Sequence, residues 1–144
     1  MTRTEVLVDA NVFMYALGGP HTYRDPCRAI VRSMGSSERG WVPVVDAELF
    51  QEIAYRYRRS GRPELGLDIQ RGILALGLRV VAIDERVLAE FISLQLGHPQ
   101  ASARDLVHVA VMQSEAIDSI LTADRSFESL GVTRLDPLDF ASGL

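Results

Sequence analysis

Short apolar runs alternate with amphipathic segments along the chain. The apolar runs are rich in β-branched residues and predict strands at residues 4–8, 40–45, 78–84 and 119–124, with a last edge strand at 133–135. The amphipathic segments predict helices within residues 24–34, 46–61, 62–77, 85–97 and 102–115, a short helix from about Ala10 and a helical turn at 125–130. Strands that alternate with helices predict an α/β fold, with a mostly parallel central sheet flanked by helices.

Several of these helices carry start and stop signals. Asp25 is expected to be the N-cap of its helix, with Pro26 at the first helical position. Asp46 is expected to cap the helix that Gly61 ends, and Asp84 to cap the helix that follows the third strand. These signals place the helix boundaries close to the ends of the strands.

Length and composition fit one soluble domain spanning residues 1–144. The chain has 47% hydrophobic and 24% charged residues, with no signal-peptide pattern and no apolar run long enough to cross a membrane. The single cysteine, Cys27, has no partner for a disulfide, which suits the reducing cytoplasm. The net charge of −4 means that a polyanion would be bound through a local basic patch or through cations.

Acidic residues lie where the predicted parallel strands end. Asp9 directly follows the first strand and Asp124 ends the fourth, so both are expected at the same edge of the sheet. Asp105 opens a nearly all-apolar helix, whose first turn should therefore point into the domain, and Glu48 and Glu52 belong to the helix after the second strand. Taken singly, each acid has a structural explanation as a helix cap or a solvent-facing residue.

Taken together, these acids predict a metal site. Carboxylates that converge without cations would repel one another and shift toward protonation. Mg²⁺ or Mn²⁺ would remove the conflict, because both ions prefer oxygen ligands. Three histidines and one cysteine argue against zinc. His108, one turn after Asp105, is interpreted as a core residue, which is the commoner role of a histidine on an apolar helix.

Four motifs in a fixed order resemble the PIN-domain ribonucleases, and among them the VapC toxins of toxin–antitoxin pairs. The motifs are "VDANVF", "ELFQEIAYRY", "SARDLVHVAVM" and "ILTADRSF", and the similarity covers essentially the whole chain. The resemblance implies a three-layer PIN-like α/β fold and metal-dependent hydrolysis of RNA phosphodiester bonds by an endoribonuclease. It also implies a VapB-type antitoxin as partner and a toxin homodimer.

The resemblance assigns expected roles to particular residues. Asp9, Asp105 and Asp124 match the family's acidic positions, and Asp9 and Asp105 are the expected direct ligands of Mg²⁺ or Mn²⁺. Asn11 matches the small polar residue two positions after the first acid. Thr122 matches the hydroxyl residue two positions before the last. Both are expected to orient the ligands by hydrogen bonds.

The fourth acid has two candidates on one helix face. Glu48 and Glu52 are four residues apart, so both point to the same side. The segment "FQEI" favours Glu52, with Glu48 as the alternative. Glu52 and Asp124 are expected to complete the site or to hold metal-bound waters.

The basic segment at residues 55–62, at the end of the same predicted helix, is a candidate RNA contact. In "YRYRRSGR" the tyrosines alternate with Arg56, Arg58 and Arg59, which suits phosphate contacts and base stacking. The alternative is a basic last helical turn that the helix dipole favours.

Three other functions remain open at this point. The first is a metal-dependent phosphohydrolase or DNA nuclease, and the second is a catalytically inactive binding module of the same fold. The third, a phosphoacceptor signalling domain, is disfavoured because it would use a lysine late in the sheet, and the chain has no lysine.

Overall fold

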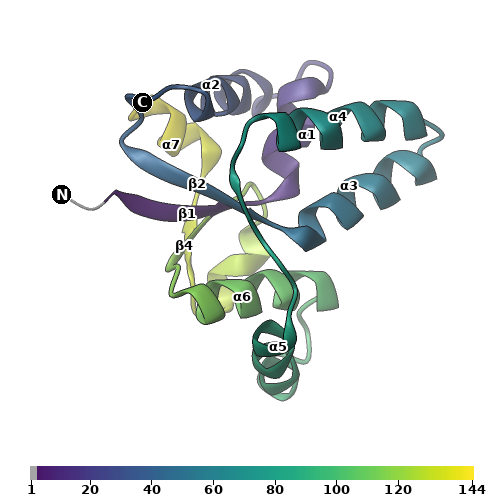
Figure 1. Cartoon of the computed structure of the whole chain (residues 1–144), viewed down its shortest axis with the longest axis vertical. Helices are drawn as coiled ribbons and strands as arrows, with labels where there is room; N and C mark the ends of the chain where they lie inside the picture. Colours follow the sequence, from purple (N-terminus) through teal and green to yellow (C-terminus); the bar gives the residue numbers. More distant parts are fainter. Residues whose placement is uncertain (1–2) are drawn as a thin grey trace.

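The computed structural model describes residues 3–144, which form a five-stranded sheet with helices on both faces (Figure 1). All four strand pairings are parallel, and the strand order is β3-β2-β1-β4-β5. The strands are β1 (Thr4–Val8), β2 (Trp41–Asp46), β3 (Arg79–Val81), β4 (Ser119–Leu121) and β5 (Thr133–Leu135). The predicted strands at 78–84 and 119–124 are shorter than expected, because the chain leaves the sheet before it reaches Asp84 and Asp124.

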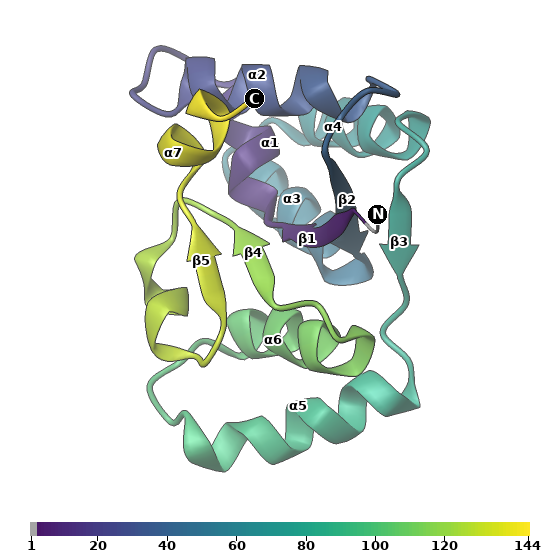
Figure 2. The ribbon, with the colours of Figure 1, turned by 90° about the vertical axis from the view of Figure 1, so that its left-hand side faces the viewer.

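The helices form two layers, one on each face of the sheet (Figures 1 and 2). They are α1 (Ala10–Leu17), α2 (Arg24–Met34), α3 (Ala47–Arg59), α4 (Pro63–Ala75), α5 (Glu85–Gly97), α6 (Ala103–Glu115) and α7 (Pro137–Ser142), with a 3₁₀ helix, η1 (Arg125–Ser129). Side chains alternate along β1, so Val6 and Val8 pack toward α1, α2 and α3, while Leu7 packs toward α6. The predicted three-layer α/β fold is therefore confirmed.

Two of the three predicted aspartate caps are present. The Asp46 and Asp84 side chains accept the backbone N–H groups three residues later, at the starts of α3 and α5. Asp25 is not a cap, so this prediction was wrong. Helix α2 begins at Arg24, after Tyr23, and Asp25 lies within the first turn, where a negative charge is favoured by the helix dipole.

Helix α7 was not predicted from the sequence. It has six residues, too few for an apolar period to show, and it begins with Pro137 after the capping side chain of Asp136. The edge of the Phe140 ring packs on Trp41, with the ring centroids 4.8 Å apart. Helix α7 therefore packs on the same side of the sheet as α2 and contacts it.

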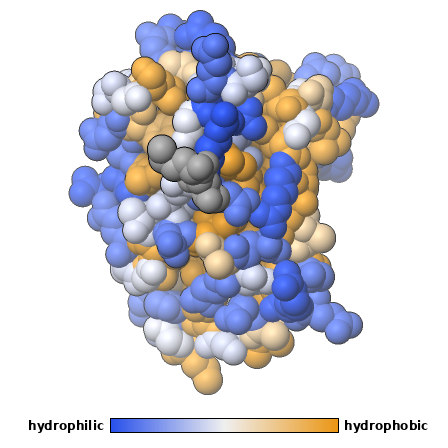
Figure 3. Space-filling view, turned by 60° about the vertical axis from the view of Figure 1, so that its left-hand side comes forward, coloured by the Kyte–Doolittle hydropathy of each residue, from blue (hydrophilic) through white to orange (hydrophobic). Residues whose placement is uncertain are grey.

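The outer surface carries both polar and apolar side chains (Figure 3). On α5, which lies at the lower end of the molecule in Figures 1 and 2, Leu88, Ile92 and Leu96 are exposed at a spacing of four residues. Across residues 3–144, none of the helices combines the length and the apolar character that a membrane span requires.

Strands β1 and β4 meet where the chain order of the sheet reverses. A parallel sheet opens a crevice at such a point, at the carboxyl ends of its strands. The backbone N–H of Asp9 donates to the carbonyl of Leu121 at 3.1 Å, which fixes the end of β1 against the end of β4. The fold therefore brings the segments after these two strands to one place.

Candidate active site

A cleft of about 620 Å³ opens at the carboxyl edge of the sheet. Asp9, Glu52, Asp105 and Asp124 all line it, although they come from the end of β1, from α3, from α6 and from the loop before η1. Asn11 lines it as well. The fold thus brings together the four acids that the sequence singled out.

Asp9 occupies the floor of this cleft and is almost completely buried. Its Oδ1 accepts the N–H of Ala10 at 2.7 Å, so the residue caps α1. Its Oδ2 accepts from the hydroxyl of Thr122 at 2.8 Å and from the Asn11 amide at 3.3 Å. Both carboxylate oxygens are therefore held by the protein, Oδ1 by the start of α1 and Oδ2 by Thr122 and Asn11.

Asn11 and Thr122 hold this arrangement across the sheet edge. The Asn11 amide donates to Thr122 Oγ1 at 2.9 Å, and Asn11 Oδ1 accepts the N–H of Ala123 at 3.2 Å. Thr122 Oγ1 also accepts the N–H of Asp124 at 3.0 Å. The hydroxyl of Thr122 thus donates once and accepts twice, and these bonds fix the orientation of Asp9.

The two candidate glutamates on α3 occupy different environments. Glu52 is buried and lines the cleft, and burial followed by the nearby charge of Asp9 raises the pKa of its carboxyl to about 6. Glu48, one turn earlier, does not line the cleft, and its Oε1 lies 3.6 Å from Nε of Arg104. Of the two glutamates, it is Glu52 that lies beside the other acids of the cleft.

Asp105 and Asp124 form the more open side of the cleft. Burial raises the pKa of Asp105, and the charge of Asp124 raises it further. Ser126 Oγ donates to Asp105 Oδ2 at 3.2 Å, while the exposed Asp124 accepts the N–H of Ser126 at 2.9 Å and caps η1. The two acids are thus connected through one serine.

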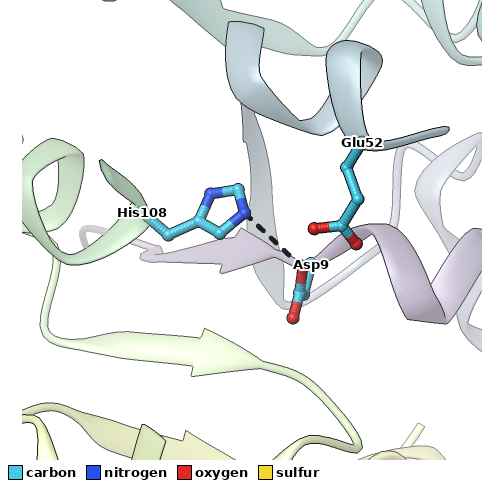
Figure 4. Close-up of side chains that lie close together, drawn as sticks. All are labelled: Asp9, Glu52 and His108. Carbon is cyan, nitrogen blue, oxygen red and sulfur yellow. Dashed lines mark ion pairs between the residues drawn. The ribbon is translucent and has the colours of Figure 1, made fainter. Parts of the chain in front are cut away.

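His108 is buried, as interpreted from the sequence, but it also faces the acids (Figure 4). Its Nδ1 lies 2.6 Å from Asp46 Oδ2, and its Nε2 lies 3.7 Å from Asp9 Oδ1. Ligand atoms of His108, Asp9 and Glu52 all lie within 4.8 Å of one another. Burial alone would lower the pKa of His108, but the charges of Asp46, Asp9 and Glu52 raise it to about 10.

The sequence could have indicated in part that His108 faces the acids. It follows Asp105 by three residues, so the two side chains lie on the same side of α6. Its contact with Asp46 joins residues 62 positions apart, which no local pattern reveals.

The basic residues are divided between the cleft and the outer surface. Arg56 lines the cleft, whereas Arg58 and Arg59 do not; both are exposed residues on the last turn of α3. Arg104 also lines the cleft, although the sequence analysis did not single it out. Its Nε lies 3.7 Å from Glu52 Oε1, and its guanidinium carbon lies 5.4 Å from the centre of the Tyr55 ring. One wall of the cleft is therefore cationic and aromatic.

Comparison with known proteins agrees with this fold and this cleft. The sequence model of the PIN domain matches residues 6–132, and the chain belongs to the PIN domain family. Its curated relatives are VapC ribonucleases. The chain is 33% identical to ribonuclease VapC13 of Mycobacterium tuberculosis over 132 residues, covering 90% of this chain and 98% of that protein. It is 32% identical to ribonuclease VapC23 of the same species, covering 86% and 96%.

Solved structures show the same fold at low sequence identity. VapC20 of M. tuberculosis, described as a toxin that cleaves the sarcin-ricin loop, has a TM-score of 0.74 at 14% identity, over 89% of this chain and 96% of that one. VapBC2 from Rickettsia felis, bound to a DNA fragment from its promoter, has a TM-score of 0.71 at 12% identity, over 92% and 98%.

Proposed function

We propose that this protein is a metal-dependent endoribonuclease that acts as the toxin of a type II toxin–antitoxin pair. One observation carries the proposal: Asp9, Glu52, Asp105 and Asp124 line a single cleft in a chain that is one-third identical to VapC ribonucleases. The reaction is hydrolysis of an RNA phosphodiester bond. An anionic substrate can approach so many carboxylates only when cations lie between them.

The donor set of the cleft fits a divalent cation. The acids supply hard oxygen ligands. Burial and neighbouring carboxylates raise the pKa values of Glu52 and Asp105, and a cation would offset both effects. We assign Asp9 and Asp105 as direct ligands of Mg²⁺ or Mn²⁺, with Glu52 and Asp124 completing the site. A bound cation of this kind lowers the pKa of a coordinated water and so supplies the nucleophile.

The other residues of the cleft orient the acids and hold the RNA. Asn11 and Thr122 keep the Asp9 carboxylate in one orientation, so that it need not reorganise when substrate binds. Arg56 and Arg104 lie where they can contact phosphates next to the bond that is cut. Tyr57 lines the same wall and offers a ring for base stacking.

We also propose a VapB-type antitoxin as partner, a homodimer as the assembled state and the cytoplasm as the location. Solved structures of the same fold include VapBC complexes, which supports the antitoxin. The exposed apolar side chains of Leu88, Ile92 and Leu96 on α5 support a protein interface. Light scattering of the purified protein tests the dimer, and a monomer at micromolar concentration would contradict it.

Cleavage of a cellular RNA pool tests the activity. The purified protein is incubated with RNA in Mg²⁺, in Mn²⁺ and in EDTA, beside Asp105→Asn. Asp68→Asn is the matched control, because Asp68 is an exposed acid on α4 outside the cleft. We expect discrete metal-dependent cuts that persist in the control and fall by more than about 100-fold in Asp105→Asn, a larger loss than that of an outer-shell partner. Cuts in DNA alone would favour a DNA nuclease, and no cuts at all a binding module.

A further inference from the structure

We propose that His108 supplies a nitrogen ligand, through Nε2, to the cation of this site, and that Asp46 is the positioning residue that holds the imidazole ring for it. The inference rests on the proposed metal-dependent function and deepens it. It names a donor other than oxygen and predicts which ions the site prefers.

The orientation of the His108 ring is fixed from the side away from the cleft. Asp46 Oδ2 lies 2.6 Å from Nδ1, and both side chains are completely buried. Because a carboxylate accepts, Nδ1 keeps the donated proton, so Nε2 is the nitrogen that releases its proton and offers a lone pair when a cation binds. Histidines that bind metals are commonly held in this way, by a carboxylate on the second ring nitrogen.

The free nitrogen points at the acids. Nε2 of His108 is buried and has no hydrogen-bond partner among residues 3–144, which is unusual for a polar atom in a protein interior. It lies 3.7 Å from Asp9 Oδ1, beyond hydrogen-bonding distance, and Glu52 completes a group of ligand atoms within 4.8 Å of one another (Figure 4). A cation shared by the three side chains would satisfy all of them.

Asp46 couples this ring to the helix that carries Glu52. Its Oδ1 accepts the N–H of Leu49 at 3.0 Å and caps α3, while its Oδ2 holds His108 on α6. One buried carboxylate therefore sets the start of α3 and the direction of Nε2 together. On another side of the imidazole, the ring of Phe127 lies with its centroid 6.4 Å away and offers no polar group.

A nitrogen ligand changes which cation the site prefers. Mg²⁺ takes oxygen ligands and gives up water reluctantly, whereas imidazole suits first-row transition ions. The structure therefore favours Mn²⁺ over Mg²⁺ when both are present at equal concentration.

Pulsed electron paramagnetic resonance of the Mn²⁺-loaded protein tests the ligand directly, because a coordinated imidazole gives a ¹⁴N modulation of the Mn²⁺ signal. We expect this modulation in the wild-type protein and its loss in His108→Gln, which retains His21 and His98 as the other possible nitrogen sources. Mn²⁺ bound without ¹⁴N modulation in the wild type would overturn the proposal, and this measurement needs no variant that might fail to fold.

Calorimetric titration with Mn²⁺ and Mg²⁺ tests the role of Asp46. Asp46→Asn keeps an equally good N-cap but removes the carboxylate from His108, so we expect Mn²⁺ affinity to fall about 10- to 100-fold. Asp84→Asn is the matched control, because Asp84 caps α5 by the same bond and does not contact His108. Equal affinities in both variants would contradict the positioning role.

The two tests also separate this inference from the proposed function. RNA cleavage with Mn²⁺ bound and no ¹⁴N modulation overturns the nitrogen ligand and leaves the ribonuclease assignment standing. Absence of both metal binding and RNA cleavage overturns the function on which the inference rests.

Discussion

The hydroxyl of Thr122 donates a 2.8 Å hydrogen bond to Oδ2 of Asp9 and joins two strand ends that are 113 residues apart in the chain. Thr122 is completely buried, and all of its hydrogen-bonding capacity is used within this network. The acid at the floor of the cleft is therefore oriented by the protein itself. An orientation fixed in advance avoids reorganisation at the moment of reaction.

Replacing Thr122 by valine tests this orientation. Thr122→Val keeps the shape of the side chain but leaves Asn11 and Asp9 without their shared partner, so we expect stability to fall by about 1–3 kcal/mol. Metal affinity should fall about 10- to 100-fold, as measured by calorimetric titration. Thr122→Ser retains the hydroxyl and should restore most of the affinity; equal metal affinities in the two variants would show that the hydroxyl does not orient Asp9.

The cation-free protein should lose stability as the pH rises through the alkaline range. The pKa of His108 is raised from 6.5 to about 10 in the folded state, so the fold binds a proton that the unfolded chain releases at lower pH. The contribution of His108 is fully present below pH 6.5 and is lost as the pH approaches 10. We expect the Tm measured in EDTA to fall across this interval, and His108→Gln to flatten the fall. His98→Gln, outside the cluster, should leave the profile unchanged, and a profile equally steep without His108 would contradict this account.

Arg56 and Arg58 should differ in their effect on RNA binding, although they lie on the same helix end. Arg56 lines the cleft and Arg58 does not. Arg56→Gln should weaken binding and reduce the slope of log K against log salt by about 0.7 for each phosphate of a single strand that the arginine neutralises. Arg58→Gln should change the slope less. The measurement is fluorescence anisotropy over a salt series in an Asp105→Asn background, in which we expect the RNA to stay uncut during the measurement. Identical slopes would remove Arg56 from the interface.

The close approach of α4 to α3 depends on Gly66. A Cβ at this position would lie 2.8 Å from Cβ of Tyr57, a residue of the cleft wall. Gly66→Ala should therefore destabilise the protein by about 1–3 kcal/mol in urea unfolding. Gly72→Ala on the same helix has open space around the new methyl group and should instead stabilise by about 0.5–1 kcal/mol. A Gly66→Ala variant as stable as the wild type would show that the two helices can separate without cost.

The fold could be predicted from the sequence because local signals agreed with one another. Apolar runs marked the strands, and Asp46 and Asp84 marked helix starts that the structure confirms. Asp25 was misplaced because an aspartate within the first turn and one at the cap both satisfy the helix dipole. Helix α7 is held mainly by packing against α2, an arrangement that leaves no periodic pattern in six residues.

The acids of the cleft could be found in the sequence because strand ends in a parallel sheet share an edge. The same reasoning could not predict the contacts that are made in the site by His108, Asp46 and Arg104. His108 was correctly predicted to be buried, but its two nitrogens face residues on other elements, and Asp46 was identified only as a cap. Arg104 is a single arginine without a basic run, so only the fold shows that it lies beside Glu52.

Asp9 and Thr122 directly follow the central strands β1 and β4, whereas Arg56 and Tyr57 stand on the last turns of α3. On the proposed function, the residues that contact RNA therefore stand on a different element from those that hold the cation, so the two sets can change separately. Relatives that cut a different RNA are then expected to differ at the end of α3 and at Arg104, while they keep the acids that follow the strands.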